Sequence, residues 1–221
     1  HLDEHKISVC YNGYNRTIFK SSRPDNLQQV LRTYHLERPY FLYVSRIEHP
    51  GKNHINLIKA FEKIIPTMPD AHQLVFAGSD WNGAEEVKSY IDKSPYASQI
   101  KLLGYVPTAH LPALYHGASA SVFHSLYEGF GIPLVEAMAC GVPVVCSNNS
   151  ALLEMAGNTA LTFDPYSVND IADKLPLILS QHTIRERFIK ESLARCHDFD
   201  WDKLALHIGR MLNAKNNRSM S

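Results

Sequence analysis

Two glutamates flank a glycine-rich turn in the stretch HSLYEGFGIPLVEAMACGVPVV, which runs from His124 to Val145. Glu128 precedes the tripeptide 129–131 (Gly-Phe-Gly), and Glu136 lies eight residues after Glu128. Glycine lets a backbone come close to a ligand, and carboxylates accept hydrogen bonds from hydroxyl groups. The pattern indicates a site for a hydroxyl-bearing ligand, although either glutamate taken alone could also be an ordinary surface charge.

Positive charge is expected close to the same turn. Pro133 marks the first turn of a helix, and the free amides at a helix N-terminus attract phosphate. Arg46 and Lys52 lie in the stretch SRIEHPGKN, which follows a strand-like run. A ligand with phosphates in its middle and hydroxyl-rich groups at its ends fits this set, and a nucleotide sugar is such a ligand. Singly, each feature is more commonly a loop charge, a turn or a first-turn carboxylate.

Composition narrows the class of protein. The chain has 221 residues, is 45% hydrophobic and 20% charged, and carries a formal net charge of zero. No global field therefore favours nucleic acid or an anionic membrane, and no apolar run is long enough for a membrane span. The N-terminal HLDEHKISVC has no signal-peptide core and no initial Met. We expect the chain to be a piece of a longer protein, one large domain or a domain and a half.

The cysteines and histidines predict no metal centre. The four cysteines form no CxxC pair, and we expect buried reduced thiols, as in a cytoplasmic protein. The twelve histidines are scattered, with no HExxH and no cluster at ligand spacing.

Strand-like and helix-like segments alternate along the chain. Apolar, β-prone runs predict strands at residues 40–46, 72–78, 100–106, 118–125, 142–147 and 160–165. Helical spacing predicts helices at 53–65, 84–93, 111–118, 132–140 and 151–157, and from 168, 183 and 201, with Asn53 and Thr108 as caps. This alternation is typical of an α/β fold with a Rossmann-like, doubly wound parallel sheet.

The organisation has three parts. Residues 1–39 hold a leading strand (6–15) and a connector with one short helix. Residues 40–180 form the main α/β domain, and residues 181–221 hold the last helices and a polar tail expected to fray. Ligands of open parallel sheets bind at the carboxyl ends of the strands. The loops SRIEHPGKN, GYVP and SLYEGFG should therefore open at one edge.

The same residues carry a family resemblance. EGFGIPLVEAMACGVPVV resembles the E-x7-E region of the retaining glycosyltransferases of family 4, which have the GT-B fold. YVSRIEHPGKNHINLIKAF, LGYVPTAHLPALYHGASASVFHS, SALLEMAGNTALTFDP and YNGYNRTIF resemble other segments of that family. The similarity runs from about Ile7 to Leu204 and would make the chain the C-terminal, donor-binding half of such an enzyme.

The resemblance implies roles for individual residues. Arg46 and Lys52 would bind the diphosphate and stabilise it as leaving group, and Glu128, the third catalytic residue, would contact the transferred sugar. Glu136 would hold the ribose hydroxyls. The other donor-binding positions are Gly129, Phe130 and Gly131 at sugar and phosphate, Gly104, Tyr105 and Val106 at the base, and Val135.

The implied reaction transfers a hexose, with mannose favoured, from a GDP- or UDP-linked donor to a glycan or lipid-linked acceptor, retaining the anomeric configuration. Such enzymes usually need no metal or other cofactor. The acceptor belongs to an N-terminal domain outside this sequence, so the chain alone should hold donor but transfer poorly. Polysaccharide assembly in the cytoplasm, with peripheral attachment to the inner face of the membrane through that domain, is the expected setting.

Some features depart from the family or favour other functions. His124 stands where the family often has proline, and it either reaches the phosphates or has no such role. DFDWD, residues 198–202, contains a DxD pattern but begins a helix, where Asp200 would be a cap. The alternatives are a catalytically silent nucleotide-sugar-binding domain and a GT-B epimerase or phosphorylase. A nicotinamide dehydrogenase is disfavoured because no GxGxxG follows the first strand.

Overall fold

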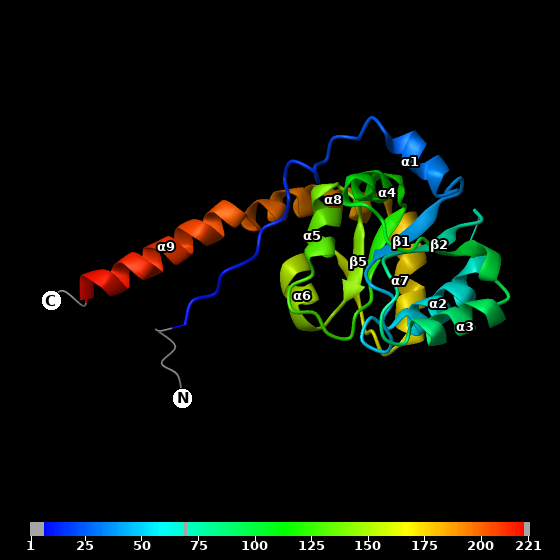
Figure 1. Ribbon diagram of the computed structural model, residues 1–221. Coiled ribbons are helices and arrows are strands. Elements are labelled where there is room, and N and C mark those ends of the chain that lie inside the picture. Colours follow the sequence, from blue (N-terminus) through cyan, green and yellow to red (C-terminus); the bar gives the residue numbers. More distant parts are fainter. Residues whose placement is uncertain (1–6, 69, 219–221) are drawn as a thin grey trace.

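Parallel strands form one sheet at the centre of the molecule (Figure 1). The computed structural model describes residues 7–68 and 70–218, and within them six strands lie in the order β3-β2-β1-β4-β5-β6. Their bounds are β1 Tyr40–Val44, β2 Gln73–Ala77, β3 Ile100–Leu102, β4 Ala120–Phe123, β5 Val144–Ser147 and β6 Leu161–Phe163. The order reverses between β1 and β4, which pair through Phe41 with Ala120 and Leu42 with Ser121. The predicted doubly wound parallel sheet is confirmed.

Helices follow almost every strand and cover both faces of the sheet (Figure 1). On one side α2, α3 and α7 pack together, and on the other α5 packs against α6 and α8. The bounds are α1 Leu27–Thr33, α2 His54–Ile64, α3 Ala84–Lys93, α4 Leu111–Gly117, α5 Ile132–Ala139, α6 Ser150–Ala156, α7 Val168–Ser180, α8 His182–Arg195 and α9 Trp201–Arg218. Short 3-10 turns cover Ile65–Thr67, Ala97–Gln99, Thr108–His110 and Cys196–Asp198. No described helix is both long and apolar enough to cross a bilayer.

Apolar residues of the strands and of the inner helix faces form the core. The side chains of Tyr40 to Tyr43 in β1 are at most 1% exposed, as expected for a strand covered on both faces. In α2 the apolar residues at helical spacing are all buried, and they are Ile55, Leu57, Ile58, Phe61 and Ile64, with Ile65 just beyond the helix. The period-3.6 pattern therefore predicted the buried face of this helix correctly.

The leading strand predicted at residues 6–15 is wrong for its described part. Residues 7–15 belong to no strand, and Lys6 lies outside the described residues. Ile7 and Val9 are 56% and 73% exposed. These residues favour a strand by type, but they pair with no edge of the sheet. The segment instead lies next to α9, where Ser8 Oγ is 2.7 Å from His207 Nε2. Helix α9 itself projects from the body of the molecule (Figure 1).

Four smaller predictions also need correction. Asn53 precedes α2, but its φ is +56° and its side-chain amide donates to the Pro165 carbonyl instead of capping the helix. Thr108 opens a 3-10 turn, and His110 is the residue that precedes α4. Cys10 is exposed, whereas the other cysteines are buried thiols as expected. The tail predicted to fray is helical as far as Arg218, and residues 219–221 lie outside the described part.

Candidate functional site

The loops after the strands meet at the carboxyl edge of the sheet, as predicted. The Leu126 amide in the loop after β4 donates to the Gly51 carbonyl in the loop after β1, with N and O 2.9 Å apart. The Gly78 amide after β2 donates to the Gly104 carbonyl after β3, also at 2.9 Å. A Cβ at Gly78 would lie 1.9 Å from the Ser45 carbonyl oxygen, so only glycine lets these loops approach so closely.

An ion pair occupies the centre of this edge. Lys52 Nζ lies 2.5 Å from Glu128 Oε1, although the two residues are 76 positions apart in the sequence. Their side chains are 16% and 22% exposed, so both are mostly withdrawn from water but still reachable. A charge pair in such partial burial interacts more strongly than one on the open surface. The predicted cation and the predicted sugar-contacting carboxylate are therefore direct partners.

Arg46 lies beside this pair but more in solvent. Its side chain is 53% exposed, and its guanidinium lies 4.8 Å from the centre of the Trp81 ring and donates to Glu48 Oε2 at 3.1 Å. A guanidinium stacked on an indole keeps its edge donors available. Arg46 is thus held at the edge of the site, where its remaining N–H groups can bind an anion.

The glycine turn brings the start of α5 to the same place. Gly131 has φ +90°, a left-handed conformation that favours glycine, and α5 begins at the next residue with Pro133 in its first turn. A Cβ at Gly129 would meet nothing within 4 Å, so the space beside its backbone is open. The Phe130 ring is turned towards Tyr11 and Phe199, at centroid distances of 6.5 and 5.8 Å. Only its backbone and part of its ring remain beside the site.

A cavity of about 330 Å³ joins these groups. The residues lining it are Val44, Ser45, Arg46, Lys52, Phe123, Glu128, Phe130, Gly131, Ile132, Pro133 and Leu152. All three predicted catalytic residues therefore face one space, together with two positions of the glycine turn.

Other predicted donor-binding residues lie outside this cavity. Tyr105 is 74% exposed at the end of the loop after β3, and Gly104 turns that loop with φ +65°. Val106 and Val135 are 7% and 0% exposed. Val135 lies on the buried face of α5, so its side chain is not open to a ligand in this structure, and its role as a donor-binding residue stays a prediction.

Glu136 lies one turn into α5 and is half-buried. Burial raises the pKa of its carboxyl group to about 7. The Tyr115 hydroxyl donates to the Pro133 carbonyl at 3.0 Å and lies 3.4 Å from Glu136 Oε2. Glu136 does not line the cavity around Lys52, so any ligand reaching both glutamates has to extend beyond it.

His124 does not reach the site. Its ring is fully buried and stacks on Phe163, with the ring centroids 5.2 Å apart. Neither ring nitrogen has a hydrogen-bond partner among the described residues. Burial lowers its pKa to about 3, so the imidazole is neutral. The interpretation that His124 contacts phosphates is therefore not supported by its position.

The DxD pattern has a structural explanation. Asp200 directly precedes α9, and its Oδ1 accepts a hydrogen bond of 2.9 Å from the Asp202 amide, as a helix cap does. Its Oδ2 lies 2.9 Å from a nitrogen of Arg16. No group of three or more His, Cys, Asp or Glu side chains within the described ranges is arranged to hold a metal ion.

Two residues at the site were missed by the sequence analysis. Ser125 Oγ donates to Glu128 Oε1 at 2.6 Å, and Tyr43 lies behind it with its hydroxyl 2.8 Å from Ser125 Oγ. The available signals were the position of Ser125 two residues after β4 and the hydroxyl of Tyr43 in a mostly apolar strand. Neither signal distinguishes a site residue from a satisfied buried hydroxyl without the fold.

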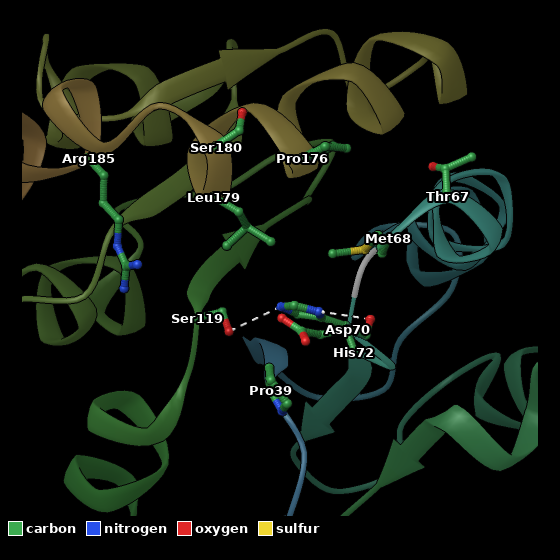
Figure 2. Close-up of a pocket in the computed structure, with 10 residues that line it drawn as sticks. All are labelled: Pro39, Thr67, Met68, Asp70, His72, Ser119, Pro176, Leu179, Ser180 and Arg185. Atoms are coloured by element: carbon green, nitrogen blue, oxygen red, sulfur yellow. Dashed lines mark hydrogen bonds between the residues drawn. The ribbon is translucent and has the colours of Figure 1, made fainter.

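A second cavity, of about 420 Å³, lies at the opposite edge of the sheet (Figure 2). Its walls include Pro39, His72 and Ser119, which directly precede β1, β2 and β4. The His72 ring lies 3.3 Å from both the Ser119 hydroxyl and the Asp70 carbonyl, so these polar groups already have partners (Figure 2). Since ligands of such sheets bind at the carboxyl edge, we place the functional site at the cavity around Lys52 and Glu128.

Comparison with known proteins identifies the class to which this site belongs. The sequence profile of the family described as "Glycosyl transferases group 1" matches residues 13–195. The chain belongs to this family.

Individual relatives agree. The O-antigen chain mannosyltransferase B of Escherichia coli is 35% identical over 182 residues, which cover 81% of this chain and 47% of that protein. The chain thus spans about half the length, or less, of the curated relatives it matches.

Solved structures share the fold. Alr3699/HepE of Anabaena, in complex with UDP and glucose, superposes with a TM-score of 0.81 at 22% identity, covering 93% of this chain and 56% of that one. The C-terminal domain of a glycosyl transferase group 1 family protein (LpcC) of Francisella tularensis gives a TM-score of 0.66 at 22% identity, covering 83% of this chain and 96% of that one.

Proposed function

We propose that this chain is the donor-binding half of a retaining glycosyltransferase of family 4. It binds a nucleoside diphosphate sugar at the carboxyl edge of its sheet, and the complete protein transfers a hexose to a glycan or lipid-linked acceptor. The observation that carries the proposal is the single cavity into which Arg46, Lys52, Glu128 and the start of α5 all face.

The positive side of the cavity suits the leaving group. When the bond between sugar and diphosphate breaks, negative charge builds on the phosphate oxygens. Lys52 keeps two ammonium protons beyond the one it gives Glu128, and Arg46 has guanidinium donors beyond its contact with Glu48. Fixed cations and helix amides aimed at developing charge stabilise such a transition state without a bound metal. A metal-free reaction is therefore part of the proposal.

The carboxylates suit the hydroxyl-rich ends of the donor. Glu128 lies in the cavity next to the diphosphate-binding lysine, where the transferred sugar would sit. Glu136 lies one turn along α5 and would accept from the ribose hydroxyls, with Gly104, Tyr105 and Val106 beside the base. In a retaining reaction the acceptor attacks the face of the sugar from which the diphosphate leaves. The departing phosphate then takes the acceptor's proton.

Mannose is the proposed sugar and GDP the proposed carrier. The similarity to O-antigen chain mannosyltransferases supports the choice of mannose and the assignment to polysaccharide assembly. The GDP carrier and the cytoplasmic face of the membrane are further parts of the proposal. An acceptor-binding domain, supplied by another part of the complete protein, would complete the active site. Leu206 and Leu212 on the projecting α9, 62% and 60% exposed, offer apolar surface for it. The chain alone would then bind donor with little or no transfer.

Calorimetry with GDP and UDP in the presence of a metal chelator tests the proposal. We expect saturable binding of at least one nucleotide, with GDP bound more tightly. Absence of heat for both nucleotides at millimolar concentration would overturn the proposed function. Binding of donor by a complete protein that transfers no sugar to any acceptor would instead favour the silent binding domain.

A further inference from the structure

A line of hydrogen bonds runs from the core to the glutamate of the candidate site. The Tyr43 hydroxyl in β1 lies 2.8 Å from Ser125 Oγ, and Ser125 Oγ lies 2.6 Å from Glu128 Oε1. Tyr43 and Ser125 are each 1% exposed, so neither hydroxyl is open to solvent. Because β1 and β4 are neighbours in the sheet, the line crosses the point where the strand order reverses.

The direction of the protons in this line follows from their number. A carboxylate can only accept, so Ser125 must give its single hydroxyl proton to Glu128. Ser125 Oγ can then only accept from Tyr43, whose hydroxyl stays protonated because burial raises its pKa. The carbonyl of Lys52, 3.2 Å from the same tyrosine oxygen, shares that proton. Tyr43 thus holds both the serine and the backbone of the lysine that flank Glu128.

The two oxygens of Glu128 consequently differ. Oε1 accepts from both Lys52 Nζ and Ser125 Oγ. Oε2 has no hydrogen-bond partner within the described residues, while the carboxylate lines the cavity. We propose that Ser125, oriented by Tyr43, is a positioning residue that locks Oε1 of Glu128 against Lys52 and so aims Oε2 at the transferred sugar. This inference rests on the proposed function and adds two residues and an atom assignment to that site.

A purely structural role for Ser125 makes a different prediction. If the serine only satisfied a buried polar group, its loss would lower stability and affect nucleotide and sugar alike. If it positions Glu128, Ser125→Ala leaves Lys52 in place for the diphosphate but frees the carboxylate to rotate about its remaining contact. The damage should then appear in the chemical step, because a misplacement near 1 Å can cost about 100-fold in rate.

The experiment measures transfer to water in the complete protein, as GDP release from GDP-mannose and UDP release from UDP-glucose. Water bonds to the anomeric carbon, the bond from that carbon to the diphosphate oxygen breaks, and free sugar and nucleotide result. The variants are Ser125→Ala, Ser125→Thr, which keeps the hydroxyl, and Tyr43→Phe. Ser121→Ala is the matched control, since Ser121 is a buried serine in β4 that donates to the Leu42 carbonyl away from the site. Calorimetry with GDP and UDP and thermal unfolding accompany each variant.

We expect Ser125→Ala to lower kcat about 10- to 100-fold, with KM and nucleotide affinity changed less than about threefold. Tyr43→Phe should act in the same direction, and Ser125→Thr should restore most of the rate. On a Glu128→Ala background, Ser125→Ala should have no further effect, because the serine acts only through the carboxylate.

The following results would overturn the inference. They are full kcat in Ser125→Ala, the same loss of rate on the Glu128→Ala background, or a Ser125→Ala variant that behaves like Ser121→Ala. If Ser125→Ala does not fold, Tyr43→Phe takes over the test, and its GDP affinity reports separately on the Lys52 backbone that Tyr43 also contacts. Full kcat in Tyr43→Phe, or a loss of kcat matched by the loss of GDP affinity, would then overturn the inference. A wild-type protein that binds nucleotide but releases sugar from neither donor would count against any positioning role at Glu128. One that binds no nucleotide would overturn the proposed function, and the inference with it.

Discussion

Lys52 and Glu128 are the two residues on which the candidate site depends most. Each is the direct ion-pair partner of the other, so changing either one removes the partner of its neighbour's charge. Removing a partner from a partly buried pair leaves an uncompensated charge, which usually costs more than the pair itself contributes. Substitutions here must therefore be interpreted through ligands that contact one residue and not the other.

Lys52→Ala should weaken binding of a nucleoside diphosphate by about 1.5–3 kcal/mol, the usual contribution of a hydrogen bond to a charged group. The bare nucleoside lacks the phosphates and should bind almost as before. Lys59→Ala is the control, because Lys59 is an exposed lysine in α2, the helix that follows the loop of Lys52. Calorimetry with GDP and guanosine measures both effects. Equal losses for the two ligands would show that Lys52 acts on the fold or the base.

Substitution of Glu136 and of Glu128 should affect the binding of different ligands. Glu136→Ala should weaken both the nucleoside diphosphate and the nucleotide sugar, because its expected contact is the ribose that both contain. Glu128→Ala should spare the nucleoside diphosphate, weaken the nucleotide sugar slightly and mainly lower the transfer rate of the complete enzyme, as expected for a contact that tightens in the transition state. Normal transfer by Glu128→Ala would show that this carboxylate is a bystander.

At the scale of elements, the turn into α5 sets the geometry of the site. Gly131, with φ +90°, turns the chain just before α5 begins at Ile132, with Pro133 in its first turn. A Cβ at this glycine would also lie 2.9 Å from Leu152 Cδ2. Gly129, two residues earlier, faces open space. The two glycines of one motif are therefore required for different reasons.

Gly131→Ala should destabilise the fold by about 1–2 kcal/mol, because an alanine in the left-handed region is strained. Gly129→Ala should change stability by less than about 0.5 kcal/mol, as for surface positions without special features. It should nevertheless weaken donor binding, since its methyl group would enter the space proposed for the ligand. Denaturant unfolding and donor calorimetry on both variants measure this contrast. Reversed stability effects would mean that the turn is held differently.

The elements themselves were largely predictable from sequence, and the reasons are local. The six strands of the sheet and the buried face of α2 follow from apolar runs and from helical spacing, which core burial enforces. The strand predicted at residues 6–15 was wrong over residues 7–15 because β propensity does not indicate whether a sheet edge is available for pairing. The rule that loops after parallel strands share an edge predicted that the loops of Lys52 and Glu128 meet, but not that the two side chains form an ion pair. The roles of Ser125 and Tyr43 depend on side-chain distances that no spacing rule contains.

For the molecule as a whole, buried titratable groups link stability to pH. His54 and His124 are fully buried, and burial lowers their pKa values to about 4 and about 3. Burial raises the pKa of the Glu136 carboxyl group to about 7. In the folded chain the two histidines bind a proton less readily than in the unfolded chain, whereas Glu136 binds one more readily. The pH dependence of folding should therefore contain two opposing contributions.

The signs follow from proton uptake. Below about pH 6.5 the unfolded chain protonates its histidines while the folded chain does not, so stability falls as pH drops towards 4, by roughly 1.4 kcal/mol per pH unit for each histidine. Between about pH 4.5 and 7 the folded chain keeps a proton on Glu136 that the unfolded chain releases, so this group lowers stability as pH rises. Over much of the acid range Glu136 partly cancels the effect of the histidines.

Glu136→Gln should therefore steepen the rise of stability between pH 4.5 and 6.5, and His124→Leu should flatten it. His124→Leu should also keep or raise stability at pH 7, because it removes a buried ring whose two nitrogens have no partner among the described residues. His182→Gln is the control, since the His182 side chain is 79% exposed. Urea unfolding from pH 4 to 8 gives the four curves. A His124→Leu curve parallel to that of the wild type would contradict the lowered pKa of His124. It would mean that water reaches the ring in the folded chain.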